Sequence, residues 1–222
     1  MTGALNLNNI MASPQFSSSV QMILSIALIS LVPFFLISVT SFLRIIIVFA
    51  LLRTALGTQQ VPPNAVLTGI ALFMTVFIMT PVWKEVNDTA VVPYQKGKLT
   101  EVKAFEAGMK PITQFMLRQT RENDLALFVQ FAKIKPPTRA EEVPAYVVIP
   151  SFMISELKTA FQIGFLLFIP FIIIDLVVAN ILLSLGMFML SPVMVSLPFK
   201  ILLFVLVDGW NLITRGLLMS FR

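Results

Sequence analysis

The sequence of 222 residues contains no cysteine and no histidine. Their absence excludes a zinc site with cysteine or histidine ligands, a thiol nucleophile, a disulfide framework and a histidine proton relay. Any chemistry would have to use carboxylates, lysines and hydroxyls. No catalytic residue, cofactor or metal site is expected in this sequence.

Charge is also scarce, since only 12% of the residues are charged while 57% are hydrophobic. Together with a mean hydropathy of +0.90, this composition is far from that of a soluble globular domain and predicts a membrane protein. The formal net charge is +5, but the basic residues form no cluster interleaved with stacking aromatic side chains. Nucleic acid is therefore not an expected partner.

The few charges are unevenly placed along the chain. Ten Lys or Arg and eight Asp or Glu lie between Lys84 and Pro144, and only nine charged residues occur elsewhere. This distribution divides the sequence into a polar N-terminal segment (1–19), a first hydrophobic hairpin (20–83), a polar insert (84–144) and a second hydrophobic hairpin (145–222). Residues 1–19 lack the basic and apolar regions of a signal peptide.

Helical rather than strand patterns fill the two hydrophobic segments. No charge occurs from Val20 to Leu43, which is long enough to cross a hydrocarbon core of about 30 Å, and Pro33 should kink this helix. The apolar pattern continues to a predicted helix end at Gly57, and a proline-rich turn precedes a further uncharged run over 65–83. In the second segment, a break over 186–192 separates two apolar arms of similar length.

The insert contains one helical pattern, over about 109–132. Met109, Ile112, Phe115 and Met116 recur at spacings of three and four, and Arg118 and Arg121 follow on the polar side. Helix-breaking residues bracket the pattern, with Pro93 and Gly97 before it and Pro136–Pro137 after it. The expected fold is an all-α membrane protein with two long, kinked helical hairpins and a small helical insert.

Ionisable residues inside apolar segments are costly unless they are paired or hydrated, so each is a candidate functional residue. These residues are Arg44, Arg53, Glu156, Lys158, Asp175, Lys200 and Asp208. They either form ion pairs that position helices and subunits, or transfer protons or substrate. Helical geometry places Glu156 and Lys158 on different faces, so they should not pair with each other. Asp175 and Asp208 could also form the carboxylate pair of an intramembrane protease, but the spacing does not bring them together.

The break in the second hairpin contains Met187, Phe188 and Met189. Methionine is flexible and polarisable, which suits a deformable seal around a changing cargo. An apolar turn in lipid or at a hairpin tip explains the same residues, and the spacing alone does not separate the two interpretations.

Several stretches together resemble the FliP family of flagellar type III export-gate proteins. They cover most of the chain from about residue 20 onward: Phe42–Gly57, Phe115–Glu122, Ser155–Phe165, Ile174–Ala179 and Ser196–Trp210. The resemblance implies a non-enzymatic, pore-forming subunit that conducts unfolded flagellar proteins across the bacterial inner membrane. The injectisome counterpart, SctR, shares the pattern less closely.

The resemblance also implies partners and a location. Members assemble, in five copies, with FliQ-like and FliR-like subunits in the flagellar basal body, alongside export proteins such as FlhA and FlhB. Much of that complex is raised toward the periplasm, and the insert is expected on the periplasmic side. Kinked apolar helices that carry charges are easier to explain against protein neighbours than in lipid.

Two site assignments come from the resemblance. A methionine loop from each subunit closes the lumen in the family, and the matching residues here are Met187, Phe188 and Met189, with Phe188 replacing an expected methionine. Glu156 and Lys200 match positions suited to pairing between subunits, and we predict an ion pair between them. The alternative functions are an SctR-type injectisome subunit and a small-solute secondary transporter, although the latter would show internal repeats.

Overall fold

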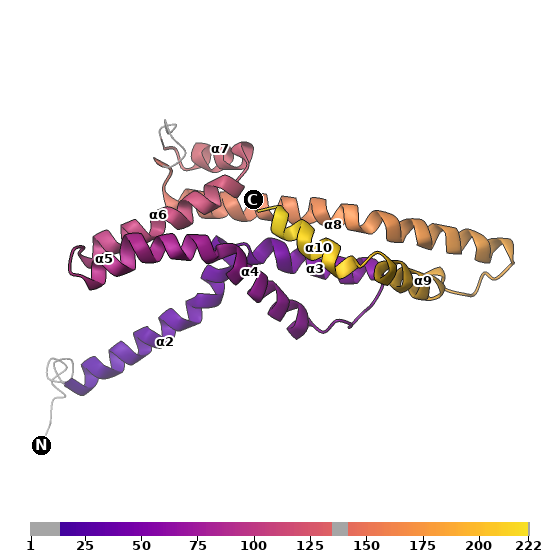
Figure 1. Ribbon diagram of the computed structural model, residues 1–222, viewed down its shortest axis with the longest axis horizontal. Coiled ribbons are helices and arrows are strands. Elements are labelled where there is room, and N and C mark those ends of the chain that lie inside the picture. The colour runs from indigo at the N-terminus through magenta and orange to yellow at the C-terminus, as the bar shows by residue number, and fades with distance from the viewer. Residues whose placement is uncertain (1–13, 135–141, 222) are drawn as a thin grey trace, which may run out of the picture. The chain divides into compact units, whose positions relative to one another are not determined.

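The computed structural model describes residues 14–134 and 142–221, and all regular elements in this part of the chain are helices (Figure 1). Most of the polar segment predicted over 1–19 lies outside the described residues. The chain divides into two units, residues 1–37 and residues 38–222. The helical fold predicted for a membrane protein is therefore confirmed.

The first unit contains most of one long helix, α2 (Pro14–Val39). Pro33 lies inside this helix, which continues to Val39. Large apolar side chains such as Met22, Ile26 and Ile29 are exposed along it. An apolar surface of this kind is typical of a helix that lipid or another protein covers.

The second unit begins with helices α3 (Phe42–Leu56) and α4 (Asn64–Val86). Helix α3 ends as predicted at Gly57, which has a φ of 79° and donates its backbone N–H to the carbonyl of Thr54 at 3.0 Å. A side chain at this position would be strained, because left-handed backbone is readily adopted only by glycine.

Helix α4 does not end where the charged insert begins. It continues through a π-helical turn, η1 (Asn87–Val91), into α5 (Val92–Gln95), making a continuous helical run of 32 residues. Pro93 was expected to break the helix, but it lies inside this run, directly after the π-helical turn and two residues before the run ends. The run ends at Gln95, and Gly97 in the turn that follows has a φ of 68°.

The helix predicted over 109–132 is in fact two helices, α6 (Glu101–Gln119) and α7 (Glu122–Phe131). Thr120 and Arg121 between them have extended backbone, with ψ values of 131° and 140°. The Arg121 N–H donates to the Ser155 hydroxyl at 3.0 Å instead of continuing the helical hydrogen bonds. A long-range contact therefore ends α6, which local periodicity could not show.

The second hydrophobic segment contains α8 (Ala145–Ser184), α9 (Pro192–Leu206) and α10 (Gly209–Met219). Helix α8 is 40 residues long and packs most extensively on α3, and α9 lies against both α8 and α3 (Figure 1). Helices α9 and α10 meet at a bend of 63°. The segment is thus a hairpin whose returning arm is broken at Val207 and Asp208.

The core of the second unit joins the insert to both hydrophobic segments. Phe115 and Met116 of α6 are buried against α4 and α8, and Ile112 packs against the same cluster. The cluster comprises Val39, Met79, Val82, Phe115, Met116, Val143, Val147, Val148 and Phe152. Three of the four residues of the predicted apolar face, Ile112, Phe115 and Met116, therefore pack on helices of the same chain.

Two helical runs within the described residues, Asn64–Gln95 and Ala145–Ser184, are long and apolar enough to cross a membrane. Two bent helix pairs, Ser25–Val39 with Phe42–Leu56 and Pro192–Leu206 with Gly209–Met219, raise this number to four if each pair forms one span. The fold thus supports a membrane protein by helix length and composition.

Candidate gate loop and buried charges

The loop between α8 and α9 forms because the helix ends in a glycine turn. Gly186 has a φ of 70°, and the N–H of Met187 donates to the carbonyl of Leu182 at 2.9 Å. This bond completes a helix end of the type that favours glycine. Pro192, at the first position of α9, then starts the returning helix.

The gate residues predicted from the sequence all lie in this loop and are all exposed. Met189 is fully exposed, Phe188 is 76% exposed and Met187 is 46% exposed. Their side chains contribute little to the core of the chain. Contiguous exposed apolar side chains at a hairpin tip indicate a surface that something else covers.

Far from this loop, Arg44 of α3 and Glu156 of α8 form a buried ion pair. Glu156 has no exposed surface and Arg44 is 2% exposed. Arg44 donates from Nε to Oε2 of Glu156 at 2.9 Å and from a terminal nitrogen to Oε1. The planar guanidinium fork matches the two carboxylate oxygens, so two parallel bonds join α3 to α8.

Arg44 also organises the end of α10 and the end of α6. It donates to both the carbonyl and the hydroxyl of Ser220 at 3.0 Å, and to the Gln119 side chain at 3.1 Å. Its guanidinium lies 3.8 Å from the ring centroid of Phe221. One buried arginine therefore connects four elements of the second unit, and its charge is satisfied by several acceptors at once.

A second ion pair joins the two arms of the second hairpin. Nζ of Lys200 lies 2.7 Å from Oδ2 of Asp175 and donates to the carbonyl of Ala55 at 3.3 Å. Ser196 donates its hydroxyl to the other carboxylate oxygen of Asp175. The pair links α8 and α9 to the end of α3.

Within the chain Glu156 and Lys200 do not pair with each other, since Glu156 is neutralised by Arg44 and Lys200 by Asp175. The predicted pair between subunits stays a prediction. The carboxylate pair of Asp175 and Asp208 is not formed either, because Asp208 is exposed at the start of α10. Arg53 donates to the side chain of Asn64, which starts α4.

A third polar cluster, centred on Asp124, was not identified from the sequence. Asp124 is buried, pairs with Lys158 and accepts a hydrogen bond from Ser155 at 2.8 Å. Arg121 beside it donates to Thr159 at 3.2 Å. This cluster fixes the junction of α6 and α7 on α8, and it confirms that Glu156 and Lys158 have different partners.

Burial alone would raise the pKa of Asp124 above its ordinary value of 3.8. Hydrogen bonds from Lys158 and Ser155, with the positive charges of Lys158 and Arg121, outweigh burial and lower the pKa instead. Asp124 therefore stabilises the fold in its ionised form. A sequence signal existed, because an acidic residue in the first turn after an extended residue is typical of a helix start.

No group of three or more acidic residues in the described part of the chain could hold a metal ion. The FliP family model matches residues 25–217, which include the loop and all three ion pairs. The chain belongs to the FliP family.

Three relatives in this family are similar to the chain over most of their own length. The flagellar biosynthetic protein FliP of Bacillus subtilis is 53% identical over 205 residues, which are 92% of this chain and 93% of the relative. The FliP of Caulobacter vibrioides is 49% identical over 99% of this chain and 82% of its own length. The FliP of Aquifex aeolicus is 46% identical over 92% of this chain and 86% of its own length. The family resemblance inferred from sequence motifs is thus confirmed.

Proposed function

We propose that this FliP-family chain is a pore-forming core subunit of the flagellar type III export gate, which conducts unfolded flagellar proteins across the inner membrane. The observation that carries the proposal is the loop at Met187–Met189. It is apolar, exposed and held at the tip of a hairpin whose arms are fastened by the Lys200–Asp175 pair. The family match and the membrane-length helices support the same function.

A secretion pore must admit an unfolded chain without leaking ions. A ring of apolar side chains resists ion passage by dewetting, and flexible side chains can separate around a cargo and close behind it. Met187 and Met189 have this flexibility, while Phe188 adds bulk. Because the loop side chains pack little within the chain, they are available to meet those of neighbouring subunits.

The proposal requires partners: further copies of this chain, with five expected, and FliQ-like and FliR-like subunits. The exposed apolar side chains of α8 and α9 support such contacts, for example Phe165, Ile173 and Leu202. Export proteins such as FlhA and FlhB would adjoin this core. We place the assembly in the basal body, with the insert on the periplasmic side of the inner membrane.

The test replaces Met187, Phe188 and Met189 by alanine together. We expect assembly to persist and leakage of ions or small molecules across the inner membrane to rise, while three leucines should leak less because they restore bulk. A matched control replaces three apolar residues that are exposed on α4, namely Leu72, Phe73 and Val76, by alanine. Wild-type conductance and secretion in an assembled triple-alanine loop variant would contradict the proposal.

A further inference from the structure

The methionines of the second unit differ sharply in exposure. Met74, Met79 and Met116 are buried in the core, and the last two have no exposed surface. Met189 is fully exposed and Met187 is 46% exposed. The reaction of a thioether with an oxidant depends on the access of the oxidant to the sulfur. The two methionines of the loop should therefore be oxidised well before the buried ones.

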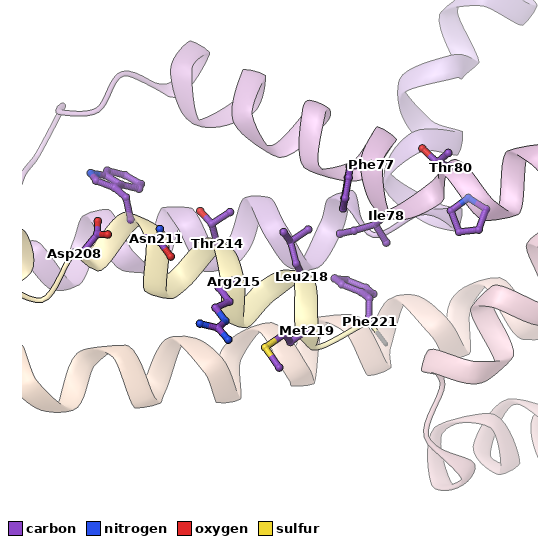
Figure 2. Close-up of a pocket in the computed structure, with 12 residues that line it drawn as sticks. Phe77, Ile78, Thr80, Asp208, Asn211, Thr214, Arg215, Leu218, Met219 and Phe221 are labelled. Atoms are coloured by element: carbon purple, nitrogen blue, oxygen red, sulfur yellow. The ribbon is translucent and has the colours of Figure 1, made fainter.

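Exposure alone does not distinguish the loop, because three methionines on helices are exposed as well. These are Met22 on α2, Met194 on α9 and Met219 on α10, where Met219 lines the open groove between α4 and α10 (Figure 2). Met187 and Met189 differ from them because they lie in the loop that we assign to the seal. A chemical change of their side chains would therefore change a barrier, and not only a surface.

The backbone holds both sulfur atoms at the tip of the hairpin. Gly186, with a φ of 70°, ends α8, and the N–H of Met187 donates to the carbonyl of Leu182 at 2.9 Å. Pro192 begins α9 on the other side of the loop. The loop between these two fixed helix ends is short, so its side chains stay at the tip.

We propose that Met187 and Met189 form an oxidation site that regulates the seal, with hydrogen peroxide or a related two-electron oxidant as the reactant. The sulfur attacks one peroxide oxygen, the S–O bond forms as the O–O bond breaks, and the other oxygen leaves as water after proton transfer. The sulfur loses two electrons and the peroxide gains them, which gives methionine sulfoxide. This inference rests on the proposed gate function and adds a regulation of the same loop.

Oxidation removes the property on which an apolar seal depends. A dewetted ring resists ions because its side chains offer water no hydrogen bonds, whereas a sulfoxide is polar and accepts them. Sulfoxides at Met187 and Met189 of each subunit would draw water into the ring and lower the barrier to ions. The lumen on either side of the ring gives a small oxidant access to these sulfur atoms.

Phe188, between the two methionines, limits the effect. Its side chain is 76% exposed, and a peroxide that oxidises a thioether leaves a phenyl ring unchanged. The oxidised loop therefore keeps one bulky apolar side chain, and its leak should stay below that of the triple-alanine loop. Phe188→Met would add a third thioether and should make the seal more sensitive to the oxidant.

The first experiment locates the modification in the assembled complex. Inner-membrane vesicles that contain the complex are treated with hydrogen peroxide, and sulfoxide at each methionine is followed by peptide mass spectrometry. We expect sulfoxide to form several times faster at Met187 and Met189 than at Met79 and Met116. Equal rates at all four positions would overturn the proposal, because the loop would then have no preferential access to the oxidant.

The second experiment measures ion leakage of the same vesicles before and after peroxide. The wild-type leak should rise several-fold, and methionine sulfoxide reductases A and B together, supplied with a thiol, should return it toward its starting value. Peroxide should not raise the leak of a variant with Met187→Leu and Met189→Leu, and it should raise that of Phe188→Met more than that of the wild type. An equal rise in the double-leucine variant and the wild type would refute the assignment.

The matched control is Met219→Leu, which removes an exposed methionine outside the loop. Its leak should equal that of the wild type before peroxide and rise equally after it. Loss of the rise in Met219→Leu would contradict the proposal, because the sensitive methionine would then lie on α10.

The triple-alanine loop variant separates failure of this inference from failure of the gate function. If that variant leaks without peroxide, while a wild type with sulfoxide at Met187 and Met189 does not, the gate function stands and the oxidation proposal is wrong. If neither leaks, the loop is not the seal and both are wrong.

Discussion

Removing the buried carboxylate of Glu156 should destabilise the chain more than any other single change to its charges. Glu156 has no exposed surface and is the only carboxylate that the described residues place on Arg44. Glu156→Ala leaves a buried guanidinium without its counter-ion, which costs about 3–5 kcal/mol. Glu156→Gln also removes the counter-ion and turns an amide NH2 toward one guanidinium donor, but it keeps one acceptor oxygen, so it should cost less than Glu156→Ala.

The assay is thermal unfolding of the purified chain in detergent, followed by tryptophan fluorescence. A chain of this size shifts its midpoint by about 2–4 °C per kcal/mol, so Glu156→Ala should lower the midpoint by about 6–20 °C. The matched control is Glu106→Ala on α6, since Glu106 is exposed and has no partner among the described residues.

A double variant separates the ion pair from general damage to the core. Replacing Arg44 by methionine and Glu156 by leucine removes both charges at similar volume, which is often neutral or stabilising for a buried pair. We expect it to recover at least half of the loss, the remainder reflecting the bonds from Arg44 to Ser220 and Gln119. If Glu156→Ala matched Glu106→Ala, or if the double variant were no better than Glu156→Ala, the reasoning would be refuted.

Two further predictions concern other parts of the second unit. The lowered pKa of Asp124 means that its stabilisation is present above its ordinary value of 3.8 and is lost as pH falls through the folded value. The unfolding temperature of the wild type should therefore fall as the pH is lowered below about 4. The Asp124→Asn variant should have a lower unfolding temperature at pH 7 and lose less of it on acidification. Parallel pH profiles of the two proteins would contradict this. Gly164→Ala should cost about 1–3 kcal/mol in a denaturation assay, because a Cβ there would lie 3.2 Å from Cβ of Leu51, whereas Gly69→Ala, in open space, should be neutral or stabilising; equal effects would contradict close packing of α3 on α8.

Much of the fold was predictable because its local signals are strong. The uncharged runs predicted long helices, Gly57 predicted the end of α3, and the break around Gly186 predicted the turn between α8 and α9. The same signals failed where a distant contact decided the backbone, as at Thr120 and Arg121. There the hydroxyl of Ser155 accepts the Arg121 N–H and divides one predicted helix into two.

The candidate site was predictable in its residues and not in its pairings. The rarity of charge in apolar segments pointed to Arg44, Glu156, Asp175 and Lys200 without any structure. Their partners depend on which helices lie side by side and in which register. Arg44 and Glu156 are 112 positions apart, so no local sequence pattern indicates that they are in contact. Each charge of the predicted Glu156–Lys200 pair has a partner within the chain, and the pair between subunits stays a prediction.

The sequence by itself determined that this chain is an all-helical membrane protein of the FliP family, because hydropathy, helix ends and family motifs are local properties. Only the tertiary structure decided how its buried charges are neutralised and where the predicted helix of the insert divides into two. These features arise when distant segments are brought together, and the low-dielectric interior then makes each pairing energetically decisive.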